Sequence, residues 1–289
     1  MSNAPRLRRL QIDALEDRTV PAYVAAPNFP VVAGTANVRP VDVVAADFNG
    51  DGKADAATAN QAGHSVSVLL SNGNGTFALP SAYAVGREPG AIKVVDVNRD
   101  GKPDLVTANR GDETVSVLIG NGNGTFKPAV HHAVPTDPVD LAGGDFNGDG
   151  KVDVAVVCQG ANAVTFLLGN TAGTLTAGGS VTVGNSPKAI AVADFNEDDR
   201  PDIATVTGDV QVNLNTTTGV GNPTFGPTLT YDGGFGGVDS LLAGDFSGDG
   251  RPDLVAGHPF ASGDGISLLV GNPDGSFQPP AEFDGAHQP

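Results

Sequence analysis

Oxygen-bearing side chains recur at alternate positions of a nine-residue phrase that the sequence repeats five times. The copies begin at Asp47, Asp96, Asp145, Asp194 and Asp245, so the steps between them are 49, 49, 49 and 51 residues. The first copy reads Asp-Phe-Asn-Gly-Asp-Gly-Lys-Ala-Asp, with acidic or amide side chains at positions 1, 3, 5 and 9. Alternation lets a curled backbone aim these side chains at one point, and the glycine at position 6 permits a sharp turn. The phrase therefore predicts a loop that binds a hard cation.

The donor set of each loop indicates calcium. Three carboxylates, one amide or hydroxyl oxygen and the carbonyl of position 7 suit a hard ion with six or seven oxygen ligands, whereas magnesium usually keeps several waters. Soft metals would require Cys or His, and the loops contain neither. We expect up to five calcium ions, one per loop. The predicted ligands are Asp47, Asn49, Asp51, Lys53 and Asp55; Asp96, Asn98, Asp100, Lys102 and Asp104; Asp145, Asn147, Asp149, Lys151 and Asp153; Asp194, Asn196, Asp198, Arg200 and Asp202; and Asp245, Ser247, Asp249, Arg251 and Asp253.

The fourth loop departs from the pattern. Asp199 replaces the glycine at position 6, and Glu197 adds a further charge. The extra acid favours a cation while the lost glycine strains the turn, so the sequence leaves the occupancy of this loop open. An EF-hand is excluded because its bidentate Glu at position 12 is replaced by Thr58, Thr107, Val156, Thr205 and Ala256.

The acidity of the chain is largely accounted for by these loops. The formal net charge is −17. The predicted ligand positions hold fifteen of the 33 acidic residues, three Asp in each loop, so five divalent ions would leave about −7. The charge argues against nucleic acid as a partner, because phosphates require a basic surface. No apolar run approaches the ~20 residues of a membrane-spanning helix. The one cysteine, Cys158, lies in an apolar run and is interpreted as a buried hydrophobe.

Short apolar segments surround each loop and predict strands. One precedes the loop, as at 92–95, and a second follows it, as at 105–108. A third, as at 115–119, leads to a Gly/Asn turn, which is a favoured hairpin turn. The turn ends in a bulky residue that we expect to fill the gap between units: Phe77, Phe126, Leu175, Phe225 or Phe277. A weaker fourth strand leads to a proline near the next unit.

Four antiparallel strands per repeat of about 50 residues are typical of a propeller blade. The predicted fold class is an all-β propeller with five four-stranded blades, and residues 28–289 form the repeat domain. Residues 29–39 match 277–288 and give one surplus fourth strand. Five blades that close into a ring, an open array and a fragment of a larger propeller all remain open at this point.

The first 27 residues differ from the repeats. Four arginines fall within the first 18 positions, without the apolar stretch of a signal peptide. Residues 15–21, Leu-Glu-Asp-Arg-Thr-Val-Pro, resemble a short leader found on large bacterial extracellular repeat proteins. A disordered basic tail is the alternative interpretation of residues 1–27.

The acidic phrases and the Gly-Asn-Gly-Thr-Phe turns resemble FG-GAP/VCBS-type repeats, the calcium-loop blades of integrin α-subunit propellers and of many bacterial extracellular proteins. The resemblance covers about residues 29–289. It implies a calcium-binding propeller with the loops between first and second strands, located outside the cell or at its surface. The family commonly has seven blades, which differs from the five counted here. Fold and metal do not specify a function.

Three functions are compatible with this scaffold. We favour a non-enzymatic binding or adhesion module that contacts a protein or surface polysaccharide with the rim opposite the loops. Candidate contacts there are Asn60, His64, Arg87, Asn109, Arg110, Glu113, Gln159, His258 and Phe260. A lectin-like propeller is less favoured, because the chain has no Trp and three Tyr. An enzyme, or an accessory domain of a polysaccharide-degrading enzyme, is the third alternative, and no Gly-x-Ser-x-Gly nucleophile phrase occurs.

Overall fold

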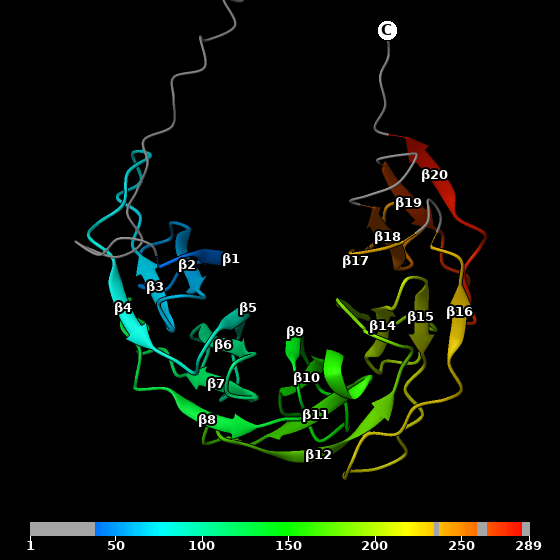
Figure 1. The fold of residues 1–289 in the computed structure, drawn as a ribbon, viewed down its shortest axis with the longest axis horizontal. Helices are drawn as coiled ribbons and strands as arrows, with labels where there is room; N and C mark the ends of the chain where they lie inside the picture. The colour runs from blue at the N-terminus through cyan, green and yellow to red at the C-terminus, as the bar shows by residue number, and fades with distance from the viewer. Residues whose placement is uncertain (1–37, 234–236, 259–264, 285–289) are drawn as a thin grey trace, which may run out of the picture. The chain divides into compact units, whose positions relative to one another are not determined.

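The structure is a computed structural model that describes residues 38–233, 237–258 and 265–284. These residues form five sheets of four consecutive antiparallel strands (Figure 1). The first two sheets comprise β1 (Pro40–Ala46), β2 (Asp55–Asn60), β3 (Ser65–Leu69) and β4 (Ser81–Ala84), then β5 (Pro89–Val95), β6 (Asp104–Asn109), β7 (Thr114–Leu118) and β8 (Val130–Ala133). The third comprises β9 (Pro138–Gly144), β10 (Asp153–Cys158), β11 (Ala163–Gly169) and β12 (Leu175–Thr182), with the 3-10 helix η1 (Gln159–Ala161) after β10. The last two comprise β13 (Ile190–Ala193), β14 (Asp202–Val206), β15 (Val210–Asn213) and β16 (Leu229–Tyr231), then β17 (Ser240–Gly244), β18 (Asp253–His258), β19 (Gly265–Leu269) and β20 (Ala281–Asp284).

The predicted all-β class and the count of five four-stranded units are confirmed. Each acidic phrase connects the first strand of a sheet to the second, and each strand pairs with its neighbour in the sequence. In three sheets the first strand begins at a proline, and the register with the second strand shifts close to it: Pro40, Pro89 and Pro138. Proline cannot donate to a sheet ladder and is confined to such ends and bulges.

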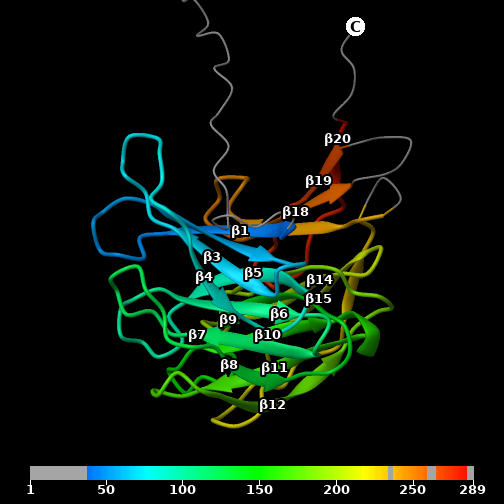
Figure 2. The same ribbon diagram turned by 60° about the vertical axis from the view of Figure 1, so that its left-hand side comes forward.

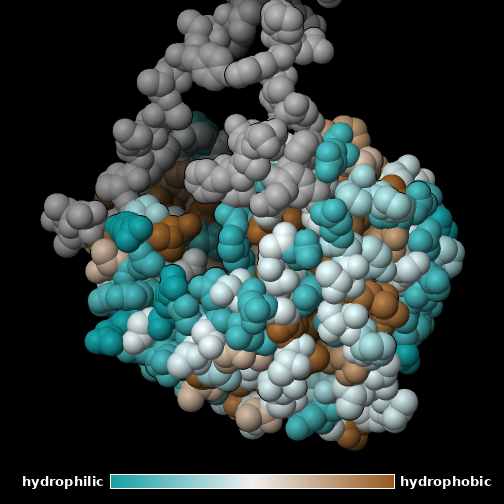
Figure 3. All heavy atoms as spheres, turned by 45° about the vertical axis from the view of Figure 1, so that its right-hand side comes forward, coloured by the Kyte–Doolittle hydropathy of each residue, from teal (hydrophilic) through white to brown (hydrophobic). Residues whose placement is uncertain are grey.

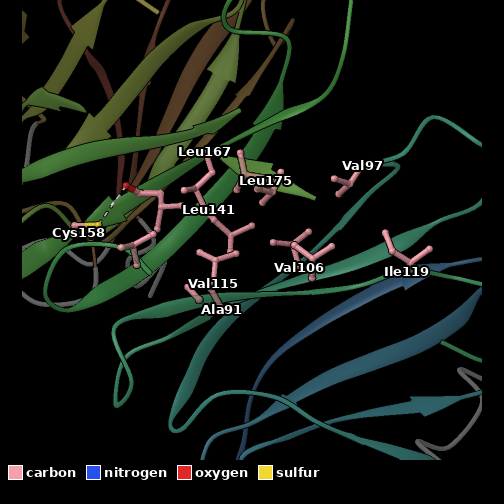
Figure 4. Close-up of a cluster of buried hydrophobic side chains, with 14 residues drawn as sticks. Ala91, Val97, Val106, Val115, Ile119, Leu141, Cys158, Leu167 and Leu175 are labelled. Atoms are coloured by element: carbon pink, nitrogen blue, oxygen red, sulfur yellow. Dashed lines mark hydrogen bonds between the residues drawn. The ribbon is translucent and has the colours of Figure 1, made fainter. Parts of the chain in front are cut away.

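Successive sheets pack face to face. We call the face that contacts the next sheet along the chain the forward face, and the opposite one the rear face. Figure 4 shows the interface between the second and third sheets. Val106 and Val115 of the second sheet form one hydrophobic cluster with Leu141 and Leu167 of the third sheet. Three similar clusters join the first to the second, the third to the fourth and the fourth to the fifth sheet. Burial of these apolar faces is the main contribution to folding.

The bulky turn residues fill these interfaces as the sequence predicts. Phe126, Leu175 and Phe277 are buried. Phe126 makes an edge contact with Phe48 of the preceding sheet, with ring centroids 5.5 Å apart, and Phe277 makes the same contact with Phe195 at 5.3 Å. Phe225 stacks on Phe166 of the preceding sheet at 5.0 Å. The bulky turn residue that recurs in the repeats therefore packs between neighbouring sheets.

The first strands of successive sheets lie next to one another. Pairwise contacts join β1 with β5, β5 with β9, β9 with β13 and β13 with β17. β4, β8 and β12 lie at the far edges of their sheets, as Figure 1 shows, and Figure 2 shows the first three sheets one above another. None of the described residues forms a helix long and apolar enough to cross a membrane. The predicted leader, residues 1–27, and the surplus segment before residue 38 lie outside the described residues.

Cys158 is fully buried, as the sequence interpretation requires. Burial raises the pKa of its thiol to about 11, with a partly opposing hydrogen bond to Thr165. A thiol with a raised pKa is a poor nucleophile because only the thiolate reacts. Cys158 therefore acts as a small apolar side chain in the interface between the second and third sheets.

Candidate functional site

The five acidic loops share one backbone conformation. Positions 4 and 6 of every loop have a positive φ, as at Gly50 (75°) and Gly52 (80°) in the first loop and Gly248 (80°) and Gly250 (90°) in the fifth. Glycine adopts this left-handed region without the steric cost that a Cβ atom introduces. The repeated glycines in the phrase therefore favour the curl of the loop, which Arg99 adopts at position 4 of the second loop without one.

The carboxylate at position 1 lies at the centre of this curl. In all five loops one of its oxygens accepts the N–H of position 5 and the other accepts the N–H of position 6. In the third loop Asp145 accepts Asp149 N–H at 3.1 Å and Gly150 N–H at 2.7 Å. Asn147 Oδ1 also accepts Asp149 N–H, at 3.0 Å. The loop thus gathers acidic and amide oxygens around its own backbone amides.

Positions 5 and 7 form an ion pair within each loop. Lys53 Nζ lies 3.0 Å from Asp51 Oδ2, Lys102 Nζ 3.5 Å from Asp100 Oδ2, and Lys151 Nζ 2.7 Å from Asp149 Oδ2. In the last two loops the pairs are Arg200–Asp198 and Arg251–Asp249. Hydrogen bonds from Lys53 lower the pKa of Asp51 below its ordinary value. The side chain at position 7 therefore already neutralises part of the loop's charge.

The carboxylate at position 9 has a different environment from the others, because it is buried in every loop. One oxygen accepts the N–H of position 2, and the other accepts an N–H at the end of the third strand or two residues beyond it. For Asp153 these donors are Phe146 at 3.1 Å and Gly169 at 2.8 Å. The same two bonds occur at Asp55, Asp104, Asp202 and Asp253. Position 9 thus fastens the loop to the end of the third strand.

Burial has a direct electrostatic consequence at position 9. It raises the pKa of Asp104, Asp153 and Asp202 to about 6, and the two backbone N–H donors oppose the rise. The nearby carboxylates at positions 5 and 1 raise it further. An added cation would favour the charged form of these groups. The structural role of position 9 was missed by the sequence prediction, which assigned it to the metal alone.

Two of the loops are also bonded to the next sheet along the chain. Gly124 N–H, in the Gly/Asn turn of the second sheet, donates to Phe48 O of the first loop at 2.8 Å. Asn215 of the fourth sheet donates from Nδ2 to Phe146 O of the third loop at 2.9 Å. These bonds attach the loop of one sheet to the neighbouring sheet.

The fourth loop keeps the curl without its glycines. Asp199 has φ 64° and Glu197 has φ 59°, in the region that side chains rarely adopt. Asn196 donates from Nδ2 to Asp198 Oδ2 at 2.9 Å, while its Oδ1 is buried without a hydrogen-bond partner. A buried oxygen without a partner is costly, and this one belongs to a predicted ligand.

Calcium fits the chemistry of these loops, and the side chains are oriented toward other partners. Carboxylate, amide and carbonyl oxygens are the ligands that calcium prefers, and the unpartnered Asn196 Oδ1 is one of them. Among the described residues, however, no three His, Cys, Asp or Glu side chains are placed to hold a metal ion. The carboxylates instead accept backbone amides and pair with position 7. The metal prediction therefore stays a prediction.

On the opposite rim, the structure corrects three of the predicted partner contacts. Asn60, Asn109 and His258 are buried inside their sheets. Asn60 Nδ2 donates to Ser67 Oγ and Asn109 Nδ2 to Ser116 Oγ, each at 2.7 Å. His258 bonds Ser267 Oγ and Gly237 O, each at 2.9 Å. These side chains stabilise the strand pairs and are inaccessible to a partner. Each side chain bonds a Ser of the adjacent strand, a contact that depends on how the second and third strands pair.

The other candidates lie at the surface of this rim. His64, Arg87, Arg110 and Glu113 are exposed and Gln159 is half-buried. Arg87 pairs with Asp112 at 2.9 Å, and Arg110 pairs with Asp137 of the turn that enters the third sheet. Phe260 lies outside the described residues. The rim therefore carries exposed polar side chains, several of which are tied to neighbouring turns.

Sequence and structure comparisons agree with this architecture. A model of the FG-GAP-like repeat matches residues 47–107, 96–156 and 145–205, which together span more than half of the chain. A comparison with curated protein sequences finds no match.

Three solved structures illustrate the fold. An Agrocybe aegerita lectin that recognises non-reducing terminal N-acetylglucosamine has a TM-score of 0.58 and 24% identity, over 83% of this chain and 65% of the lectin. A putative 6-phosphogluconolactonase from Bacteroides uniformis has a TM-score of 0.61 and 18% identity, over 84% of this chain and 70% of its own. Hydrazine synthase from Kuenenia stuttgartiensis has a TM-score of 0.58 and 14% identity, over 86% and 67%. The chain thus spans about two thirds of the lectin's length. At these identities the likeness concerns the fold alone.

Proposed function

Because this chain belongs to the FG-GAP-like repeat family, we propose that it is a calcium-stabilised, non-enzymatic binding module that works outside the cell or at its surface. The observation that carries the proposal is the common hydrogen-bond pattern of the five loops, which places the same oxygen donors in the same order each time. Five loops of one kind that are each built into a sheet suit a structural ion better than a reaction centre.

The residues that would hold calcium are the side chains at positions 1, 3 and 5 and the carbonyl of position 7. Position 9 would contribute a remaining lone pair, because each of its oxygens already accepts a backbone amide. When bound, each ion would supply positive charge that stabilises the three crowded carboxylates of its loop. Since the ion would bind the folded loop in preference to the unfolded chain, it would stabilise the fold by mass action.

The test is thermal unfolding of the whole chain with calcium, with magnesium and with a chelator. We expect the melting temperature to fall in chelator and to recover with millimolar calcium, and magnesium to restore little of it. The variant Asp149→Asn should weaken the calcium response, while the matched variant Asp112→Asn on the opposite rim should leave it unchanged. An identical melting temperature in calcium and in chelator would contradict the structural ion.

The partner surface is proposed to be the rim opposite the loops. Its turns differ from sheet to sheet, unlike the loops, and they expose His64, Arg87, Arg110 and Glu113. Loops held by a rigid scaffold are common positions for recognition. Replacing Arg87 and Arg110 with Ala should reduce retention on the native cell surface or matrix without changing the melting temperature. Full retention by this double variant, compared with wild type, would contradict the assignment of the rim.

Carbohydrate binding is a second candidate, and one local feature favours it. A groove of about 350 Å³ lies between the fourth strands of the first two sheets and is lined by Tyr83, His131, Pro128 and small residues. Tyr83 packs edge-on against Phe126, with centroids 5.5 Å apart, so its ring is fixed. The lectin of similar fold adds support at the level of architecture. A glycan array should then show binding that His131→Ala weakens, and an array without signal would exclude this function.

A further inference from the structure

Exposed hydrophobic side chains are normal on a protein surface when they occur singly, and the face in Figure 3 shows brown residues among teal ones. The informative comparison is between equivalent positions of the five sheets. Each internal interface places the forward face of one sheet on the rear face of the next. The forward face of the fifth sheet and the rear face of the first sheet have no such neighbour among the four interfaces.

The forward face of the fifth sheet is hydrophobic and exposed. Phe246 is 47% exposed, whereas the Phe at the same position is at most 2% exposed in the first, third and fourth sheets. Ile266 is 47% exposed, while Val66, Val115 and Val164 at the same strand position are fully buried. Leu242 and Phe283 on this face are 59% and 52% exposed. Hydrophobic residues of the kind that form an interface in the first four sheets are therefore exposed to solvent in the fifth.

The rear face of the first sheet shows the reciprocal pattern. Val43 is 62% exposed, whereas Ile92 and Leu141 at its position are fully buried. From Val43 to Ala46 of β1 exposure alternates, with the rear-facing Val43 and Ala45 exposed and Val44 and Ala46 half-buried. Along β17 the forward-facing Ser240 and Leu242 are exposed and Leu241 is half-buried. The exposed sides of the first and last sheets are thus opposite faces of the same repeat.

We infer that the forward face of the fifth sheet binds the rear face of the first sheet in a second copy of this chain. Both faces are exposed in one molecule, so they do not cover one another within it. The four internal interfaces are four examples of this pairing and specify its register. Such a contact is heterologous, because different patches of the two copies meet, and it forms rings or filaments according to its rotation.

The internal interfaces indicate which residues would meet. A Cβ added at Gly143, on the rear face of the third sheet, would lie 2.9 Å from Val95 Cγ1 of the second sheet. The equivalent positions at the proposed contact are Gly244 of one copy and Ala45 of the other. Leu242 would then lie near Val43, as the equivalent hydrophobic residues do in the sheet-to-sheet clusters. This pair of positions suits a disulfide, which needs Cβ atoms about 3.5–4.5 Å apart.

The first experiment measures the mass of the whole chain in solution against concentration, at fixed calcium. We expect the mass to rise above that of one chain as concentration increases. Phe246→Glu and Val43→Glu, on the two different faces, should each weaken this association by about tenfold or more. The matched control Val220→Glu, at a residue that is exposed outside both faces, should have no effect. A monomer at all concentrations, or equal effects of all three variants, would overturn the inference.

The second experiment identifies the faces by cysteine pairing. Gly244→Cys and Ala45→Cys are made in separate chains, and the native Cys158 is buried and does not compete. On oxidation, the mixture of the two variants should give a mixed disulfide dimer, and each variant alone should give little dimer. A dimer formed equally well by one variant alone, or an intrachain disulfide in the double variant at low concentration, would contradict the head-to-tail contact between copies.

Discussion

The third and the fifth loops carry the same acidic phrase in different surroundings. In the third loop Phe146 is fully buried and Asn147 nearly so, and Asn215 of the next sheet bonds Phe146 O. In the fifth loop Phe246 and Ser247 are exposed. The bonds that position 1 makes with positions 5 and 6, and that position 9 makes with position 2 and the end of the third strand, nevertheless occur in both loops. The phrase therefore determines the conformation of the loop, and the following sheet supplies its burial.

The largest effect is expected when the Phe at position 2 is replaced in both loops. Phe146→Ala removes a ring that packs edge-on against Phe166 and should cost about 3–5 kcal/mol in the free energy of unfolding. Phe246→Ala removes a ring that is half exposed and should cost less than about 1 kcal/mol in the isolated chain. Denaturant unfolding at low protein concentration, where copies do not associate, measures both. Equal losses would show that the covering sheet is not what makes position 2 important.

The second test separates the two kinds of carboxylate within the third loop. Asp153→Ala leaves the buried Phe146 and Gly169 amides without acceptors and should cost about 2–4 kcal/mol. In chelator, Asp149→Ala removes a partly exposed ion pair and should cost about 1 kcal/mol or less. Both are measured by unfolding in chelator, so that calcium contributes to neither. If Asp149→Ala were the more damaging variant, position 9 would not be the fastening that the hydrogen bonds indicate.

The strands and the loop positions could be predicted from the sequence because each leaves a local pattern. Segments such as 115–119 are short, β-branched and bounded by turns, and five copies in phase establish the unit. The bulky turn residues, for example Phe126 and Phe277, were also predictable from their fixed place in the repeat. The buried state of Cys158 followed from the apolar run around it.

The remaining features depend on contacts between segments that are distant in the sequence. Asp153 has the same residue type as Asp149, and only the hydrogen bond from Gly169, the last residue of the third strand, gives it a structural role. Asn60 and Asn109 look like polar turn residues, but the pairing of the second and third strands brings a Ser hydroxyl within hydrogen-bond distance of each side chain. The exposure of Phe246 depends on whether another sheet packs over the fifth one, which a repeat pattern does not record.

A smaller effect is expected in the fourth loop, where burial and backbone strain can be separated. Asp199 has φ 64°, while glycine occupies the same position in the third and fifth loops. Asp199→Gly should relieve the left-handed conformation and stabilise the fold by about 0.5–1 kcal/mol, even after the greater entropy of glycine in the unfolded chain. Thermal unfolding in chelator measures it, with Gly150→Asp in the third loop as the inverse control. A destabilised Asp199→Gly would show that the Asp side chain has a structural role of its own.

The smallest effect is expected where the two loops differ least. Lys151 pairs with Asp149 in the third loop and Arg251 with Asp249 in the fifth, and the cationic side chain is about one third exposed in both. Lys151→Gln and Arg251→Gln should therefore change the free energy of unfolding in chelator by a similar small amount, about 0–1 kcal/mol. Unfolding of both variants beside wild type checks this. A large loss of unfolding free energy for Lys151→Gln alone would mean that the covering sheet also acts through charge. Equal small losses for the two variants would attribute the difference between the loops to apolar contact alone.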